Sequence, residues 1–262
     1  MIPNQKLREW QEPGDQKLSM LTYELIQSIF STELKQVDFH LQGSYANHTN
    51  VKGDSDVDIL LICDDFAHEY KLSLPNLKDA VFKRLSSYDC FSCGKKTIKF
   101  NGKGGFLCAD IIPCLTINGS LDSGISLYDS STRSTIVNYP IQHKMNGERK
   151  NKETNGLFKP TVRMYKNIRN ELVSRGRMRS DLVSSYNLES LIYNVDNTCF
   201  DNDPRYCLLH THLSMRVGVS SHTHYDCQNE KVSLLDYSGK CCWNYNDAYI
   251  FLNLVSRMDM DW

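Results

Sequence analysis

The sequence has no apolar run near the roughly 18–20 residues that a membrane-spanning helix needs. The N-terminal stretch from Met1 to Glu9 also has no apolar signal core, so we expect no signal peptide. Internal repeats and low-complexity tracts are missing as well. These absences predict a cytoplasmic protein with no membrane partner, in which the ten cysteines stay reduced.

A net charge is nearly absent too, because 30 basic residues are balanced by 31 acidic ones. A protein that binds bulk nucleic acid is usually more basic, so a small polyanion such as a nucleotide is the better candidate ligand. The chain is 40% hydrophobic and 23% charged, which is typical of a folded globular protein and argues against disorder. Its 262 residues suffice for one large domain or two packed lobes.

The first half alternates between helical and strand patterns. Apolar positions at helical spacing predict a helix over residues 15–31, with Asp15 as its N-cap. Alternating apolar positions predict a strand over 37–41, which ends at a Gly-Ser turn. Similar patterns predict a second helix over 77–87 and further strands over 57–63, 97–100 and 106–112.

The second half is mainly helical. Polar residues 146–160 predict a linker or surface loop, and residues 196–244 show no clear pattern. Helical periodicity covers 161–174, 183–194 and 246–258. We therefore predict an α+β protein, with a mixed sheet, flanking helices and the N-terminal helix in residues 1–150 and a helical lobe in 151–262.

Three acidic residues in or beside apolar strands are the candidate catalytic and metal-binding groups. Asp56 and Asp58 flank Val57, so in a strand they would share one face, and a divalent cation would relieve their repulsion. Asp110 lies within an apolar run, where an acid is costly unless it is paired or bound to metal. Three carboxylates on adjacent strands would hold two magnesium ions, one at the attacking hydroxyl and one at the leaving pyrophosphate.

Two groups of residues are candidate phosphate ligands. Gly43 and Ser44 follow a strand and open a short helix, where backbone N–H groups can bind an anion. Arg163, Lys166 and Asn170 follow i, i+3, i+7 spacing on a predicted helix. This basic stripe would either hold a triphosphate or form an ordinary solvated face.

The start of the next predicted helix is a further candidate. A hydroxyl there, as on Ser185, suits a phosphate, and the ring of Tyr186 suits either base stacking or plain packing.

The cysteines and histidines leave alternatives open. Cys63, Cys108 and Cys114 lie in apolar runs and are expected in the core, and Cys90 and Cys93 form a lone CxxC motif. The stretch with His210, His212, His222, His224 and Cys227 would be either a zinc site or a polar loop with buried thiols, because zinc needs four converging ligands.

Together these motifs resemble the polymerase-β-type nucleotidyltransferase superfamily. The resemblance rests on Gln42–Tyr45, Asp54–Ile59 and Ala109–Pro113. Later stretches are similar to bacterial CD-NTases, relatives of cyclic GMP–AMP synthase and oligoadenylate synthase that serve the CBASS anti-phage system. These stretches are Ile136–His143, Phe158–Arg169, Ser185–Leu191 and the region from Trp243 to Trp262.

The resemblance implies a polymerase-β-like core and a C-terminal helical lobe with a nucleotide cleft between them. It implies magnesium, with manganese as an alternative, on Asp56, Asp58 and Asp110. It implies that Ser44, Lys166 and Ser185 contact the triphosphate, that Tyr186 stacks on a base, and that Asn138 lies at a base-reading position, where uridine-using members have an asparagine.

The hypothesis is therefore an enzyme that joins ATP, UTP or GTP into a cyclic di- or oligonucleotide with release of pyrophosphate. The resemblance implies a role in antiviral defence and a downstream effector that the product activates. The alternatives are a nucleotidyltransferase that modifies a tRNA or protein, and a non-catalytic nucleotide sensor. A small product from nucleoside triphosphates alone would support the cyclase over the macromolecule-modifying enzyme, and a thermal shift with nucleotide and magnesium without turnover would support the sensor.

Overall fold

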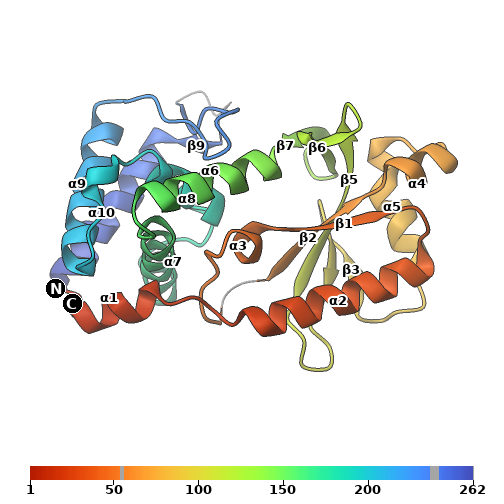
Figure 1. The fold of residues 1–262 in the computed structure, drawn as a ribbon, viewed down its shortest axis with the longest axis horizontal. Helices are drawn as coiled ribbons and strands as arrows, with labels where there is room; N and C mark the ends of the chain where they lie inside the picture. The colour runs from red at the N-terminus through yellow and green to blue at the C-terminus, as the bar shows by residue number, and fades with distance from the viewer. Residues whose placement is uncertain (54–55, 237–241, 262) are drawn as a thin grey trace. The chain divides into compact units, whose positions relative to one another are not determined.

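The computed structural model describes residues 1–53, 56–236 and 242–261, and the chain divides into two compact units (Figure 1). The sheet unit comprises residues 14–141, and the helical unit comprises residues 1–13 together with 142–262. This division differs from the predicted boundary at residue 150, because residues 1–13 and 142–150 belong to the helical unit, whereas the predicted helix over 15–31 lies in the sheet unit. Within the described ranges, no helix is both long and apolar enough to span a bilayer.

In the part that the structure describes, the sheet unit contains the four predicted strands and three further ones, over residues 91–93, 120–129 and 134–138. Its helices are α2 (Gln16–Glu33), α3 (Gly43–Ala46), α4 (Asp64–Glu69) and α5 (Leu74–Arg84). Its strands are β1 (Asp38–Gln42), β2 (Val57–Ile62), β3 (Phe91–Cys93), β4 (Ile98–Phe100), β5 (Ala109–Ile117), β6 (Ser120–Asp129) and β7 (Ser134–Asn138). Asp15 caps α2 as predicted, because its side chain accepts hydrogen bonds from the N–H groups of Lys17 and Leu18.

The strands form one mixed sheet in the order β1-β2-β5-β4-β3, and β6 extends it from β5 and pairs with β7. Strands β2 and β5 are parallel, whereas β1 and β4 run antiparallel to them. The parallel pair is at the centre of the sheet and is buried on both faces, which explains its nearly continuous apolar sequence.

Each face of the sheet carries its own core. Ile59 and Leu61 of β2 lie in the larger core, together with Phe30 of α2. Leu60 lies in the smaller core with Ile112 of β5. Because strand side chains alternate between faces, the even-numbered side chains of β2 and β5 point toward the smaller core.

The helical unit is built mainly from six helices among the described residues. They are α1 (Asn4–Gln11), α6 (Pro140–Glu153, whose first two residues belong to the sheet unit), α7 (Phe158–Ser174), α8 (Ser185–Tyr193), α9 (Pro204–Ser220) and α10 (Tyr245–Asp261). A short 3-10 helix (Asn197–Cys199) and the two-residue strands β8 (Leu235–Asp236) and β9 (Trp243–Asn244) complete it.

One sequence prediction in this unit is wrong, and one region that the sequence left unassigned contains a helix. Residues 146–160 are not a linker, because α6 covers most of them and α7 begins at Phe158. The unassigned region 196–244 contains α9. Both helices bury polar side chains, such as His143 and Asn146 of α6 and Thr211 of α9, so their hydrophobic pattern is weak.

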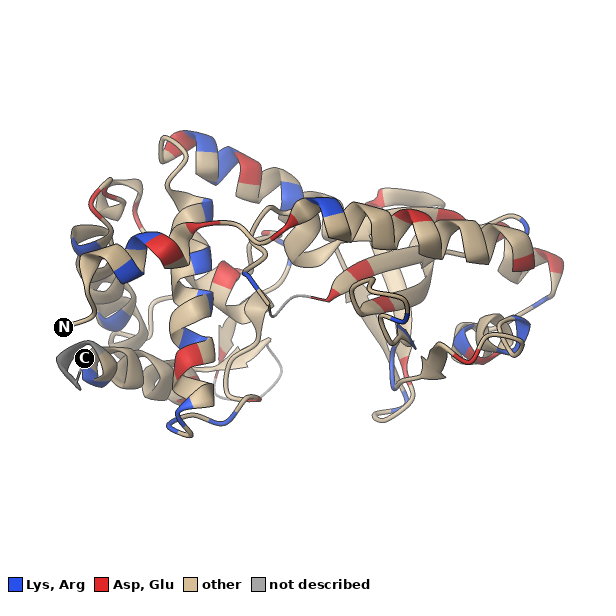
Figure 2. Ribbon diagram, turned by 90° about the horizontal axis from the view of Figure 1, so that it is seen from below, with Lys and Arg blue, Asp and Glu red and all other residues tan. Residues whose placement is uncertain are grey.

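Charged residues of both signs are interspersed over the ribbon (Figure 2), in agreement with the balanced composition. The helical unit accordingly holds several internal ion pairs rather than a uniformly basic surface.

Candidate active site

A row of four polar residues crosses the centre of the sheet. In the register of the strands, Gln42 of β1 lies opposite Asp58 of β2, which lies beside Asp110 of β5. Asp110 in turn lies opposite Lys99 of β4. Neighbours in register project from the same face, so the two carboxylates stand side by side, half-buried, on the face of the smaller core.

Asp110 is held by its neighbours on β4. The hydroxyl of Thr97 donates a hydrogen bond to Oδ1 of Asp110 at 3.0 Å. The ammonium group of Lys99 lies 3.7 Å from the same oxygen. An acid in an apolar strand is therefore paired, as the cost of burying a charge requires.

Asp56 does not join this row. It is exposed and immediately precedes β2, which begins at Val57, so it lies outside the register of the strands. It lies near α3, the helix whose first residue, Gly43, is against Asp58. Burial raises the pKa of the Tyr45 phenol in α3, and the carboxylates of Asp15 and Asp56 raise it further.

Gly43 brings the backbone against the Asp58 carboxylate. It has a φ of +71°, in the left-handed region, and a Cβ at this position would lie 2.0 Å from Oδ2 of Asp58. Only glycine fits such an approach. Ser44 follows as the second residue of α3, and its carbonyl accepts a hydrogen bond from the N–H of Thr49 at 2.8 Å.

The donor set suits magnesium bound partly by its substrate. Within residues 1–53, 56–236 and 242–261, no three His, Cys, Asp or Glu side chains form a ready-made metal cage. Magnesium commonly uses one or two carboxylates together with substrate phosphates, and Asp58 and Asp110 provide such a pair. Beside them, Oε1 of Gln42 is buried without a hydrogen-bond partner, as expected of an incomplete polar site.

In the helical unit, the predicted phosphate ligand Lys166 lies in the interior. Its side chain is only 2% exposed and pairs with Glu189 of α8. The second oxygen of Glu189 lies 3.1 Å from Nε2 of His143 in α6. Sequence reasoning missed both His143 and Glu189, because a glutamate and a histidine within helices carry no local signal.

Ser185 and Tyr186 open α8 as predicted. The Ser185 hydroxyl accepts a hydrogen bond from the guanidinium of Arg169 at 2.9 Å. The ring of Tyr186 stacks on His143, with centroids 5.2 Å apart, and its hydroxyl accepts a hydrogen bond from Asn229. Arg169 is thus a further candidate phosphate ligand at the start of α8. The predicted basic stripe of Arg163, Lys166 and Asn170 did not include it.

Arg163 of the predicted basic stripe is buried and contacts the end of α1. Its side chain is 8% exposed, and Nε donates a hydrogen bond to the Gln11 carbonyl at the end of α1, at 2.6 Å. Burial lowers the pKa of this guanidinium to about 10, although Glu12 opposes the shift. Arg163 therefore attaches α1 to α7.

Asn138 is the last residue of β7 and is half-buried. Its Oδ1 accepts a hydrogen bond from the N–H of Tyr139 at 2.8 Å, which orients the side-chain amide. The opposite residue in the register is Ile125 of β6.

Comparison with known proteins identifies the fold. Residues 24–118 match a nucleotidyltransferase domain, and residues 145–258 match the cGAS/DncV-like nucleotidyltransferase C-terminal helical domain. The chain is 30% identical to a cyclic nucleotide synthase from Staphylococcus haemolyticus and 31% identical to a cyclic UMP-AMP synthase from Rhodothermus marinus. Each similarity covers 100% of this chain and 99% of the relative.

The chain belongs to the cGAS/DncV-like nucleotidyltransferases. Two solved structures of this family have the same fold. The cyclic dinucleotide synthase of Elizabethkingia meningoseptica, solved with GTP and Apcpp, has a TM-score of 0.86 at 27% identity and covers 98% of this chain and 99% of its own. The c-UMP-AMP synthase of R. marinus, solved with Apcpp and Upnpp, has a TM-score of 0.83 at 27% identity. The match covers 100% of this chain and 98% of the R. marinus chain.

The His- and Cys-rich part of this nucleotidyltransferase forms no zinc cluster among the residues described. His210 and His212 lie in α9, where Nε2 of His212 contacts the hydroxyl of Ser256. Cys227 is buried, and its sulfur lies 3.4 Å from that of Cys242.

The core prediction for the first three cysteines is confirmed at two positions. Cys63 and Cys114 are buried, whereas Cys108 is exposed just before β5, which begins later than predicted.

Proposed function

We propose that this nucleotidyltransferase joins nucleoside triphosphates into a cyclic di- or oligonucleotide and releases pyrophosphate. Two relatives that match the whole chain are named as synthases of cyclic nucleotides, and the S. haemolyticus and R. marinus proteins set the precedent. The observation that carries the proposal is the pairing of Asp58 with Asp110 on parallel strands, directly beneath the glycine turn at Gly43.

Magnesium, or manganese in its place, would be held by Asp58 and Asp110, with Asp56 as an additional ligand once a triphosphate is bound. The bound ions would neutralise charge on the phosphates. The chain itself supplies Gly43 and Ser44 at the start of α3, where the phosphate can approach the backbone. Thr97 and Lys99 contact the Asp110 carboxylate and hold it in place.

The reaction is a displacement at the α-phosphorus. The acceptor ribose hydroxyl forms a new O–P bond, the bond to pyrophosphate breaks, and Asp110 takes the hydroxyl proton. A second displacement within the linear intermediate closes the ring. Positioning and charge neutralisation supply most of the rate in such transfers, so the carboxylate pair should matter most.

Uridine is a proposed substrate base. The amide of Asn138 is oriented by its bond to the N–H of Tyr139, which leaves its Nδ2 group to donate to a base carbonyl. The R. marinus relative, named as a UMP-AMP synthase, supports this choice. The product would act on a downstream effector in anti-phage defence of the CBASS type.

The test is incubation with four radiolabelled nucleoside triphosphates and magnesium, followed by mass analysis of the products. We expect a cyclic product from the parent protein and a loss of about two orders of magnitude or more in Asp58→Asn and Asp110→Asn, because each loses charge stabilisation of the transition state. Asp38→Asn, an exposed acid on β1 of the same sheet, is the matched control and should retain activity.

The outcomes separate the alternatives. Product that forms only after RNA or a protein is added would show a macromolecule-modifying enzyme. Nucleotide binding without any pyrophosphate release would show a sensor. Activity at the parent level in Asp110→Asn would refute the proposed chemistry of the carboxylate pair.

Base choice has its own test. In Asn138→Ala we expect the share of UMP in the product to fall relative to AMP, because a donor to the base is lost. Thr135→Ala, an exposed change on the same strand, should leave the product ratio as it is. An unchanged ratio in both variants would remove Asn138 from base selection.

A further inference from the structure

Glu189 lies in the interior of the helical unit and is shared by two basic side chains. It is 4% exposed and comes from α8. Its Oε1 pairs with the ammonium of Lys166 on α7, and its Oε2 lies 3.1 Å from Nε2 of His143 on α6. One carboxylate therefore connects three helices.

The pairing keeps Glu189 ionised despite its burial. Burial alone raises the pKa of a carboxyl group, but Lys166 and His143 outweigh it and hold the pKa of Glu189 below its ordinary value. A buried ion pair is often no more stable than apolar packing in its place, so stability alone does not explain three such groups. Geometric positioning is the use that remains.

His143 extends the contact to the aromatic ring at the start of α8. Its ring stacks on Tyr186 with an interplanar angle of 22°, and its side chain is also buried. The hydroxyl of Tyr186 is held from the other end by Asn229 at 2.9 Å, and Oδ1 of Asn229 accepts a bond from the N–H of Lys231. The Tyr186 ring is thus in contact with His143, whose Nε2 in turn lies against Glu189.

We propose that Glu189 is a positioning residue that sets the Lys166 ammonium and, through His143, the Tyr186 ring, so that triphosphate and base are bound in one fixed relation. This inference rests on the proposed function and on the roles that the family resemblance implies, in which Lys166 contacts the triphosphate and Tyr186 stacks on a base. Glu189 itself touches neither. Its loss should weaken nucleotide binding at both ends at once.

The test is the variant Glu189→Gln, which removes the negative charge and keeps the size of the side chain. We expect KM for nucleoside triphosphates to rise about tenfold, the usual effect of losing a supporting contact behind a ligand, with a smaller change in kcat. Stacking on Tyr186 should also weaken, so the fluorescence quenching of 1,N6-etheno-ATP should fall. Glu171→Gln removes a half-exposed ion pair with Arg175 on α7 and is the matched control that should change neither.

A second variant guards against misfolding, since Glu189→Gln leaves the Lys166 charge buried without its partner. Lys166→Met combined with Glu189→Gln removes both charges. We compare this double variant with Lys166→Met alone. KM should be the same in both, because Lys166 is absent from each. The quenching of etheno-ATP should be lower in the double variant, because only there is the contact between Glu189 and His143 altered. Equal quenching in these two variants would refute the route through His143.

The two hypotheses fail in different ways. If the parent protein neither binds nucleotides nor forms product, the proposed function fails. If the parent does both and Glu189→Gln matches it in KM and in quenching, or loses kcat with KM unchanged, the positioning role of Glu189 is overturned.

Discussion

At residue 43 the backbone passes so close to the Asp58 carboxylate that no side chain fits. The sequence alone suggested a glycine turn for phosphate approach. The structure adds a second constraint, because the glycine also packs on a candidate metal-binding acid. A Cβ atom added at residue 43 would therefore disturb both the turn and the position of the Asp58 carboxylate.

Gly43→Ala is expected to abolish most activity, since its methyl group would lie 2.0 Å from Oδ2 of Asp58. Gly53→Ala is the matched control. Gly53 has a similar φ of +76° but nothing within 4 Å, so that variant should carry only backbone strain of about 1–2 kcal/mol. Activity and melting temperature are measured for both, and equal activity losses would contradict the role of the Asp58 contact.

The thiols of Cys227 and Cys242 are coupled at the residue scale. Cys227 donates a hydrogen bond to the sulfur of Cys242, and this bond lowers the pKa of the Cys242 thiol below its ordinary value. The thiolate of Cys242 therefore persists to lower pH. In Cys227→Ala the donor is lost, so alkylation of Cys242 should require higher pH.

This shift is measured by peptide mass spectrometry after iodoacetamide treatment over a series of pH values. Cys63→Ala, which removes a buried thiol of the sheet unit, should leave the profile of Cys242 in place. Superimposable profiles in the parent and Cys227→Ala would contradict the coupling.

At the scale of elements, the N-cap of α2 is a local signal that the sequence carried correctly. Asp15→Ala removes the acceptor for two backbone N–H groups and should lower the free energy of unfolding by about 1 kcal/mol. Urea unfolding measures it. Glu24→Ala, an exposed acid in the middle of the same helix, makes no cap and should cost less, whereas an equal loss would argue against capping.

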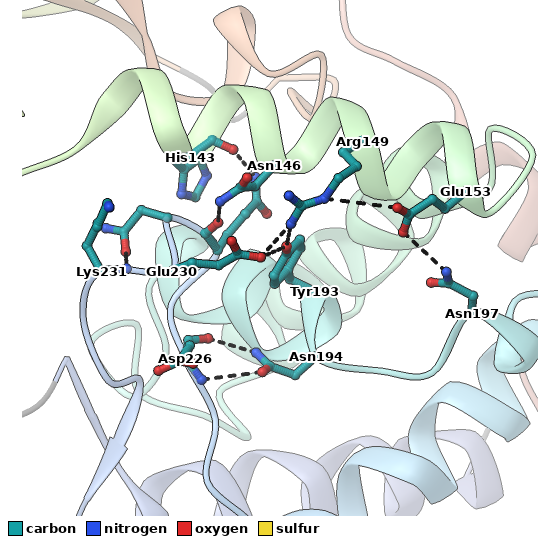
Figure 3. A network of polar contacts seen from close by, with 12 residues as sticks. His143, Asn146, Arg149, Glu153, Tyr193, Asn194, Asn197, Asp226, Glu230 and Lys231 are labelled. Atoms are coloured by element: carbon teal, nitrogen blue, oxygen red, sulfur yellow. Dashed lines mark hydrogen bonds and ion pairs between the residues drawn. The ribbon is translucent and has the colours of Figure 1, made fainter. Parts of the chain in front are cut away.

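Helix α6 shows why some elements were missed. Its inward face is polar, and its contacts come from distant segments (Figure 3). Asn146 donates to the Gln228 carbonyl, and Arg149 reaches both Tyr193 of α8 and Glu230. Such a helix lacks a hydrophobic stripe, so periodicity cannot find it.

Helix α9 was missed for a different reason, because it exposes apolar side chains. Several apolar residues of α9 are exposed, while Thr211 and His212 of the same helix are buried. Apolar and polar positions are therefore mixed on both faces, and the amphipathic signal cancels. The exposed apolar side chains are Tyr206, Leu209, Leu213 and Val217.

At the scale of the whole molecule, the chain crosses between units twice. Helix α1 leaves the N-terminus and packs in the core of the helical unit, where Leu7 and Trp10 are buried with residues of α7 and α10. Asn167 and Arg163 of α7 secure its end through the carbonyls of Trp10 and Gln11. More than 120 residues separate α1 from α7 in the sequence, and no local pattern indicates that the two helices pack together.

Leu7→Ala should destabilise the helical unit by about 3 kcal/mol, because it leaves a cavity in a closed core. Trp10 and Trp243 are buried in this unit, so their fluorescence reports its unfolding in urea. Leu21→Ala, which truncates an exposed side chain of α2, is the control. A fluorescence midpoint that moves in neither variant would contradict the place of α1 in this core.

The sequence by itself determined the elements whose apolar pattern is strong and the residue types at the candidate site. The strands that carry Asp58 and Asp110, the glycine turn before Ser44, and the family followed from local spacing and motifs. These features depend on contacts within a few residues, which the order of side chains encodes directly.

Only the tertiary structure decided which of these residues meet. Strand register paired Asp58 with Asp110, and helix packing buried Lys166 against Glu189. Arg163 and Lys166 look equivalent on one helix, yet one binds a backbone carbonyl and the other a carboxylate. Partners far apart in the chain are chosen by packing and by the cost of burying a charge, which no local pattern records.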